Sequence, residues 1–220
     1  MLLVDKYRPR RLAQVVGQTK AVRVLQRCLA RANYGKIAIA GGSGTGKTSL
    51  AYALAGELGA HAGDVHELDA ASKDGAGVAQ VREIAAEAER WGRFSLCVSP
   101  PTVWIVNEYH ALSPQAVVAW LTLLERWPVN WWVIFTTTRT QENLFGPESG
   151  AFGSRLTRIK LTSQGLCTTY ARLVRGIAAR EGMNGKDLGW YENRVKRARN
   201  NLRQVIQEID DGAALEDGDR

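Results

Sequence analysis

A glycine-rich segment that ends in a lysine and a threonine is the first stretch of this sequence that could do chemistry. GGSGTGKT, Gly41 to Thr48, fits the pattern G-x-x-x-x-G-K-[ST]. It starts at the end of the apolar run KIAIAG (36–41), which predicts a strand, and opens the Ala- and Leu-rich stretch 47–59, which predicts a helix. Glycines let backbone N–H groups turn inward, and a helix N-terminus adds partial positive charge. The segment therefore predicts a loop that binds nucleotide phosphates.

Two side chains of this loop have separate expected roles. Lys47 is expected to reach the β- and γ-phosphates of ATP, and the Thr48 hydroxyl to ligate Mg²⁺. A glycine-rich turn with a solvated lysine is the alternative, but strand, loop and helix together favour nucleotide binding. The expected nucleotide contacts in this segment are Gly42, Ser43, Gly44, Thr45, Gly46, Lys47, Thr48 and Ser49.

A second candidate position follows the apolar run TVWIVN (102–107). An ATPase with a phosphate loop needs a carboxylate at the end of a neighbouring buried strand to hold its metal ion, and a following glutamate can polarise the attacking water. Asn107 stands on the metal side and Glu108 on the water side. An amide oxygen ligates Mg²⁺ without ionic attraction. We therefore expect ATP to bind, Mg²⁺ to be held less firmly, and hydrolysis to be slow.

The elements that must position these residues follow from the hydrophobic pattern. Strands are expected at 36–41, 64–70, 102–107, 131–137 and 157–161, with helices at 47–59, 77–92 and 113–127. Strands that alternate with helices predict a parallel α/β sheet. Further helices are expected over 163–182 and, as one or two, over 189–210. Trp104, Trp120, Trp131 and Trp132 fall within these patterns and are expected in the core.

Composition and charge limit the classes of protein that remain. The chain has 220 residues, is 45% hydrophobic and carries a formal net charge of +7. Basic residues crowd positions 6–36 and 194–203, which suits an anionic partner, although a solvated helical face explains any single one. No apolar run reaches the roughly 20 residues that span a bilayer, and the N-terminus lacks the apolar core of a signal peptide. With three scattered cysteines, we expect a reduced, cytoplasmic protein with no membrane partner.

A series of motifs in fixed order makes the chain resemble the AAA+ ATPases, and among them the clamp-loader subunits: replication factor C small subunits and the bacterial tau/gamma subunit. The motifs are VDKYRPRRLAQVVGQ, GGSGTGKTSLAYALAGEL, DVHELDAAS, VNEYHALSPQAVVAWLTLLE, VIFTTT, GSRLTRIKL and NNLRQVIQEI. Asn107 replaces the family's aspartate and Leu156 the cysteine of its Ser-Arg-Cys motif. The zinc module of tau/gamma is missing, and the family's collar domain would begin where this sequence ends.

The resemblance implies a fold and further site residues. It implies an AAA+ α/β nucleotide-binding domain with a five-stranded parallel sheet at 1–162 and a helical lid at 163–210. The tail at 211–220 is expected to be disordered because it is acidic and rich in glycine. The resemblance implies an adenine pocket formed by Tyr7, Arg8, Pro9 and Val16. It also implies Thr137 (or Thr136) near the γ-phosphate, Arg203 reaching in from the lid, and Arg155 offered to the ATP of a neighbouring subunit. Lys73 and Arg82 lie where the family's DNA-facing helix begins, although a solvated helix start explains them equally well.

The function that the resemblance implies is ATP- and Mg²⁺-dependent loading of a sliding clamp at primer–template junctions. The expected partners are other AAA+ subunits, the sliding clamp, and primed or double-stranded DNA. One alternative is a different AAA+ DNA machine, such as a helicase loader or a transposition regulator. Another is a nucleotide-binding subunit whose hydrolysis is weakened by Asn107.

Overall fold

The computed structural model describes residues 1–30, 35–72, 77–92, 101–139, 152–183 and 185–215. The first elements, in chain order, are α1 (Leu3–Lys6), η1 (Leu12–Gln14), α2 (Thr19–Ala30), β1 (Lys36–Ala40), α3 (Lys47–Leu58), η2 (Ala62–Asp64), β2 (Val65–Asp69) and α4 (Val78–Gly92). They are followed by β3 (Thr102–Asn107), η3 (Tyr109–Ala111), α5 (Pro114–Glu125), β4 (Trp131–Thr137), β5 (Thr157–Lys160), α7 (Cys167–Arg180), α8 (Leu188–Arg197) and α9 (Leu202–Asp210).

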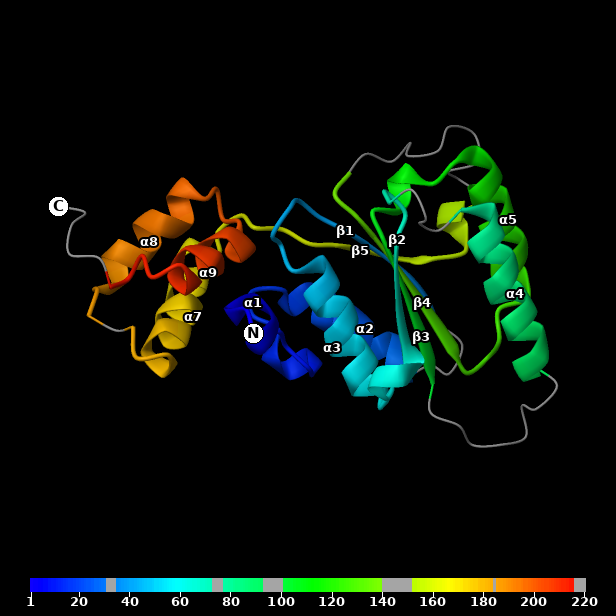
Figure 1. The fold of residues 1–220 in the computed structure, drawn as a ribbon, viewed down its shortest axis with the longest axis horizontal. Helices are drawn as coiled ribbons and strands as arrows, with labels where there is room; N and C mark the ends of the chain where they lie inside the picture. The colour runs from blue at the N-terminus through cyan, green and yellow to red at the C-terminus, as the bar shows by residue number, and fades with distance from the viewer. Residues whose placement is uncertain (31–34, 73–76, 93–100, 140–151, 184, 216–220) are drawn as a thin grey trace.

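The five expected strands form one parallel sheet in the order β2-β3-β4-β1-β5. This order confirms the predicted α/β class. It places β4 between β1 and β3, so the segments that follow these three strands meet at one edge of the sheet (Figure 1). The phosphate loop follows β1, Asn107-Glu108 closes β3, and Thr138 follows β4. Residues far apart in the sequence are therefore neighbours at this edge.

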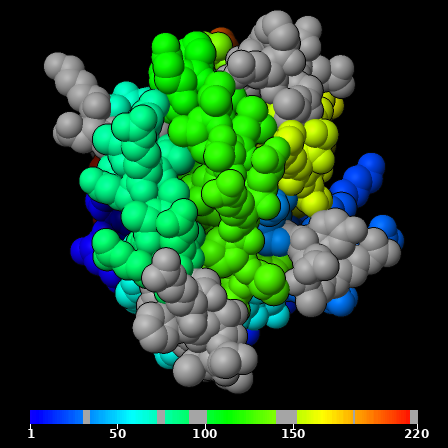
Figure 2. Space-filling model, turned by 90° about the vertical axis from the view of Figure 1, so that its right-hand side faces the viewer, coloured from blue at the N-terminus to red at the C-terminus, as the bar shows by residue number. Residues whose placement is uncertain are grey.

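Helices cover both faces of the sheet. One hydrophobic cluster joins the sheet to α4 and α5, and a second joins it to α2 and α3, so the sheet is buried on both sides (Figure 1). Figure 2 looks onto the face where α4 and α5 lie side by side. The four tryptophans predicted for the core are confirmed as buried, with exposed fractions of 6% for Trp104, 0% for Trp120, 3% for Trp131 and 8% for Trp132. The first three lie in the cluster with α4 and α5, and Trp132 lies in the cluster with α2 and α3.

Local signals set the ends of the helices next to the site. Gly46 precedes α3 with φ 91°, and Gly59 ends α3 with φ 79°, a left-handed conformation that glycine adopts at little cost. Ser113 caps α5 by accepting a hydrogen bond from the Ala116 N–H at 3.2 Å, and Pro114 follows as the first helical residue. Both starts agree with the sequence-based prediction.

The C-terminal helices α7, α8 and α9, here called the lid helices, form a third hydrophobic cluster. The helix expected over 163–182 begins only at Cys167, because a turn with Gly165 at φ 71° precedes it. The stretch expected over 189–210 is two helices, because Arg199 (φ 51°) and Asn200 (φ 60°) interrupt it. Two consecutive left-handed residues end one helix before the next begins, because a right-handed helix cannot continue through them.

The N-terminal segment packs with the lid helices. Leu3 is buried in their cluster, its N–H donates to Asp210 Oδ2 at 3.0 Å, and Lys6 forms a 2.6 Å ion pair with Glu181 (Figure 1). We therefore propose a lid that consists of 163–210 with α1 attached. Neither α1 nor α2 was expected from the sequence.

The chain after α9 also differs from expectation. Residues 211–215 form turns, and Ala214 is buried at 4% exposure in the lid cluster, so ordered structure continues past residue 210. The rest of the tail, 216–220, lies outside the described residues. Within the described part of the chain, no helix combines the length and apolar character needed to cross a membrane.

Candidate functional site

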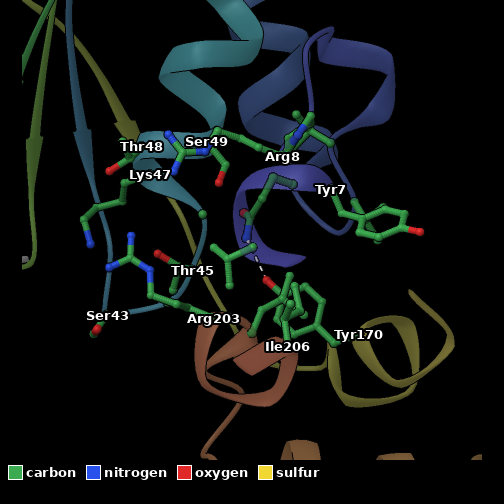
Figure 3. Close-up of a pocket in the computed structure, with 18 of the residues that line it drawn as sticks. Tyr7, Arg8, Ser43, Thr45, Lys47, Thr48, Ser49, Tyr170, Arg203 and Ile206 are labelled. Atoms are coloured by element: carbon green, nitrogen blue, oxygen red, sulfur yellow. Dashed lines mark hydrogen bonds between the residues drawn. The ribbon is translucent and has the colours of Figure 1, made fainter. Parts of the chain in front are cut away.

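A cavity of about 410 Å³ opens between the carboxyl edge of the sheet and the lid helices. Many of the predicted site residues line it: Tyr7, Arg8, Pro9, Val16, Ser43, Gly44, Thr45, Gly46, Lys47, Thr48, Ser49, Asn107, Glu108 and Arg203. Figure 3 shows the phosphate loop on one side of this cavity and Arg203 and Ile206, from α9, on the other. The tertiary structure thus gathers residues from five separate segments around one space.

The phosphate loop is built as the sequence predicts. Gly44 and Gly46 have φ of 70° and 91°, and Thr45 and Lys47 are buried. The Lys47 Nζ donates to the Gly42 carbonyl oxygen at 3.0 Å. Burial lowers the pKa of Lys47, while the carboxylate of Glu108 acts in the opposite direction. A phosphate would offer this partly desolvated ammonium a charged acceptor, which binds more strongly than a neutral carbonyl.

The side chain of Asn107 is held by three partners. Its Oδ1 accepts hydrogen bonds from Thr48 Oγ1 at 3.2 Å and Thr136 Oγ1 at 2.8 Å, and its Nδ2 donates to Glu67 Oε1 at 2.5 Å. These partners fix the orientation of the amide, since the reverse orientation would set its oxygen against the carboxylate of Glu67. The oxygen of Asn107 therefore faces the Thr48 hydroxyl.

The oxygen donors at this end of the cavity fit Mg²⁺. Thr48 and Asn107 supply neutral oxygens, and Glu67 and Asp69, which sequence analysis did not select, add carboxylates to the cavity lining. Among the described residues, no group of three or more His, Cys, Asp or Glu could hold a metal ion. The ion would complete its ligands with phosphate and water, as Mg²⁺ usually does.

Glu108 is oriented by the segment that follows β4. It has φ 49°, and its Oε2 accepts from the Thr138 N–H at 3.2 Å and from Thr138 Oγ1 at 2.8 Å. Thr138 lines the cavity, whereas the predicted Thr137 is buried with its Oγ1 2.9 Å from His110 Nδ1. Burial lowers the pKa of His110, which favours the neutral ring. The threonine that touches both Glu108 and the cavity is thus one residue beyond the predicted position.

The predicted adenine side lies near the N-terminal segment. Tyr7 and Pro9 are partly buried. The Tyr7 Oη donates to Glu181 Oε1, and in Figure 3 its ring points away from the phosphate loop. Arg8 lies over the ring of Tyr52, 4.8 Å from its centre. Tyr7 and Arg8 thus connect the cavity wall to the lid and to α3.

The lid side of the cavity was only partly foreseen. Arg203, from α9, lines the cavity as predicted, and its charge contributes to lowering the pKa of Lys47. The unpredicted lid residues on the wall are Tyr170, Leu173, Ile177, Leu202 and Ile206. Their apolar spacing predicts amphipathic helices but does not say which part of the apolar face meets a ligand.

Arg155 lies away from the cavity. Its Nη2 forms a 2.6 Å ion pair with Glu125 at the end of α5. Its charge also helps to lower the pKa of Lys36, after the larger effect of burial. Lys36 begins β1, whereas the phosphate loop follows the last residue of that strand, Ala40. Because β5 starts at Thr157, opposite Ile37, Arg155 lies by the start of β1. Lys36 and Ala40, the two ends of that strand, are about 13 Å apart.

Two further predicted residues, Gly42 and Arg82, do not line the cavity either. The backbone carbonyl of Gly42 accepts from Lys47, but Gly42 is not part of the lining. Arg82 is exposed on α4, beside a groove between α4 and α5 on the face shown in Figure 2. Lys73 lies outside the described residues.

The family of the chain follows from comparison with known proteins. Residues 37–155 match the profile of the AAA family, the "ATPase family associated with various cellular activities". The match covers more than half of the chain and includes the phosphate loop, Asn107-Glu108 and Arg155. The chain therefore belongs to the AAA family.

Within that family, the chain resembles clamp-loader subunits, as its motifs predict. It is 37% identical over 90 residues to the replication factor C small subunit of Aeropyrum pernix, a match over 41% of this chain and 28% of that protein. It is 31% identical over 160 residues to DNA polymerase III subunit gamma/tau of Mycoplasma pneumoniae, over 62% of this chain and 22% of that protein. The chain thus spans less than a third of the length of either relative.

Solved structures support the fold. RuvB of Thermotoga maritima, a Holliday junction branch migration motor, superimposes with a TM-score of 0.67 at 20% identity, over 91% of this chain and 63% of that one. A single-residue variant of the same RuvB gives a TM-score of 0.70 at 19% identity, over the same shares of the two chains. At this identity the likeness concerns the fold, and it confirms the expected AAA+ architecture.

Proposed function

We propose that this chain binds and hydrolyses ATP as a subunit of a clamp-loader-like AAA+ assembly, which loads a sliding clamp onto primed DNA during replication. The observation that carries the proposal is the single cavity lined by Lys47, Thr48, Asn107, Glu108 and Arg203. Family membership and the similarity to replication factor C and gamma/tau subunits support it.

The chain's own residues divide the work as follows. The loop amides and Lys47 bind the phosphates, and Thr48 with Asn107 holds the metal ion on its protein side. Bound Mg²⁺ would neutralise charge on the phosphates. Glu108, fixed by Thr138, orients the attacking water and accepts its proton. Arg203 adds positive charge from the lid, so closure of the lid helices depends on the nucleotide.

The position of Arg155 supports a role in a neighbouring subunit. It lies near the start of β1, because β5 begins with Thr157 opposite Ile37, whereas the phosphate loop follows the end of β1. Its place in the fold therefore separates it from the nucleotide of its own subunit. An arginine supplied in trans can contribute about 10³–10⁵ in rate. A lone subunit should accordingly be slow, and an oligomer of AAA+ subunits is the proposed active form.

The proposed DNA and clamp roles have a different basis from the nucleotide site. They come from the similarity to replication proteins and from the basic excess of the chain, with a net charge of +7. Contact through phosphates predicts affinity for primed or double-stranded DNA that falls steeply as salt rises. Arg82 and Lys73 remain the proposed contacts, and a cytoplasmic location remains a prediction.

The first test is nucleotide binding to the wild-type chain and to Lys47→Ala, followed with a fluorescent ATP analogue. We expect Lys47→Ala to lose most of its affinity, while Lys20→Ala, an exposed lysine on α2, matches the wild type. ATP turnover with primed DNA, with and without candidate clamps, then tests the wider role. Assembly on DNA with ATP but without stimulation by any clamp would favour a different AAA+ DNA machine.

Asn107 supports a second candidate, a nucleotide-binding subunit that does not hydrolyse ATP. The amide carries no charge at the position where the family places an aspartate. ATP turnover at high protein concentration with primed DNA decides between the two. Turnover that Lys47→Ala abolishes excludes this candidate, and absence of turnover, even for Asn107→Asp, supports it.

A further inference from the structure

We propose that Glu67 supplies the negative charge of the metal site, in place of the aspartate that Asn107 replaces, and that Asn107 connects Glu67 to the phosphate loop. This inference rests on the proposed function, since it concerns the Mg²⁺ that accompanies ATP.

Glu67 and Asn107 lie on neighbouring strands and face the same side of the sheet. Val65–Asp69 of β2 pairs in parallel with β3, with Glu67 opposite Ile105 and Asp69 opposite Asn107. Glu67 and Asn107 therefore project from the same face as Ile105, which packs in the cluster that contains α3. Both line the cavity, and α3 begins at the phosphate loop. The carboxylate thus lies on the metal side of the sheet.

Two hydrogen bonds of Asn107 link Glu67 to the phosphate loop. Asn107 accepts from Thr48 through Oδ1 and donates to Glu67 through Nδ2, so one side chain joins the Thr48 hydroxyl to the carboxylate. Aspartate has no N–H to donate. At position 107 it would set a second carboxylate against Glu67, and the two like charges would repel one another. Asn107 and Glu67 are therefore matched, with one negative charge between them.

The Glu67 carboxylate is held in place by a second hydrogen bond, on its other oxygen. Its other oxygen, Oε2, accepts from Tyr52 Oη at 2.6 Å, and Arg8 lies over the Tyr52 ring. The Tyr52 hydroxyl is the donor in this hydrogen bond, because a carboxylate can only accept. An ionised carboxylate has about four acceptor positions, and two donors leave the others open to a metal-bound water. Glu67 is thus fixed in place but not saturated.

Asp69 is the competing carboxylate. It also lines the cavity, but its Oδ1 accepts from the Ala71 N–H at 3.0 Å in the turn after β2. Asp69 lies opposite Asn107 in the sheet, but the described side-chain hydrogen bonds of Asn107 go to Thr48, Thr136 and Glu67. Glu67 is therefore the carboxylate that the geometry connects to Thr48.

The test measures metal binding directly. Mn²⁺ replaces Mg²⁺, and electron paramagnetic resonance counts bound Mn²⁺ while the protein holds a non-hydrolysable ATP analogue. We expect Glu67→Gln to weaken Mn²⁺ affinity by about tenfold or more, the range for residues that support a metal site through water or another ligand. Glu83→Gln, an exposed carboxylate on α4, serves as the charge-matched control. A larger effect of Asp69→Asn than of Glu67→Gln would overturn the proposal.

A charge swap keeps the test independent of any loss of stability in Glu67→Gln. The double variant Glu67→Gln/Asn107→Asp should recover most of the Mn²⁺ affinity, whereas Asn107→Asp alone should not tighten it. Wild-type affinity in Glu67→Gln, or tighter binding in Asn107→Asp alone, would contradict the role of Glu67. Nucleotide affinity, measured in EDTA and again with Mg²⁺, separates failure of the proposed function from failure of the role of Glu67. If the wild-type chain binds no nucleotide under either condition, the proposed function is wrong, and the metal experiment does not bear on Glu67.

Discussion

Gly44 of the phosphate loop lies directly against Asn201, the residue that caps α9. A Cβ atom added at Gly44 would lie 1.8 Å from Asn201 Oδ1 and 3.0 Å from its Cα. Asn201 in turn accepts from the Gln204 N–H at 3.2 Å and so fixes the first turn of the helix that carries Arg203. The phosphate loop and the lid therefore touch at a position where only glycine fits.

Gly44→Ala should consequently separate the lid from the phosphate loop. The left-handed φ adds strain of about 1–2 kcal/mol, and the clash with Asn201 displaces Arg203 as well. We expect nucleotide affinity to fall by at least about tenfold, which corresponds to 1.4 kcal/mol. Gly165→Ala is the matched control, because its φ of 71° equals that of Gly44 within a degree and a Cβ there meets nothing within 4 Å. Equal losses in the two variants would show that strain, and not the lid contact, is responsible.

Arg155 and Glu108 should act in different subunits. Arg155→Ala and Glu108→Gln should each reduce ATP turnover strongly, by about 10³ for the arginine, because one leaves the phosphate charge unbalanced and the other leaves the water unoriented. When the two variants are mixed, some interfaces combine an intact Glu108 with an intact Arg155. Steady-state turnover of the mixture should therefore exceed that of either variant alone. A mixture no more active than the sum of its parts would place Arg155 outside the reaction.

Thr138 should matter for hydrolysis more than for binding. Thr138→Val removes the hydroxyl that donates to Glu108 Oε2 at 2.8 Å, so Glu108 loses one of the contacts that orient it. We expect turnover to fall by about 10²-fold, the range of general-base catalysis, with nucleotide affinity nearly unchanged. Thr138→Ser keeps the hydroxyl and should retain turnover. Thr137→Val removes the hydroxyl of the threonine that the sequence predicts near the γ-phosphate. A larger loss of turnover in Thr137→Val than in Thr138→Val would assign the role to Thr137.

Trp120 should dominate the stability of the α5 face. It is fully buried and packs edge-to-face on Phe135 with ring centres 5.1 Å apart. Trp120→Ala leaves a cavity in the cluster between α5 and the sheet, so the free energy of unfolding should fall by about 3–5 kcal/mol. Val118→Ala, at a position 48% exposed on the same helix, should change it by about 0.5 kcal/mol or less. Urea denaturation followed by circular dichroism measures both, and similar values would contradict the packing argument.

The sequence alone determined the sheet and the phosphate loop. Both depend on local patterns: continuous apolar runs such as 131–137 for strands buried on two faces, and glycines at fixed spacing where the backbone needs positive φ. Ser113 and Pro114 likewise mark the start of α5 in the sequence itself. Such signals lie within a few residues of the structure they specify, so no knowledge of distant contacts is needed to read them.

Only the tertiary structure decided which distant residues share the site. Glu67 meets Asn107 because β2 pairs with β3, and Thr138 rather than Thr137 faces the cavity because of how the chain leaves β4. The attachment of α1 to the lid depends on Leu3 and Lys6 finding partners more than 170 residues away in the sequence. A carboxylate within a strand, such as Glu67, carries no sequence signal for its neighbour across the sheet. The register of the strands sets that relation, and it exists only once the sheet has formed.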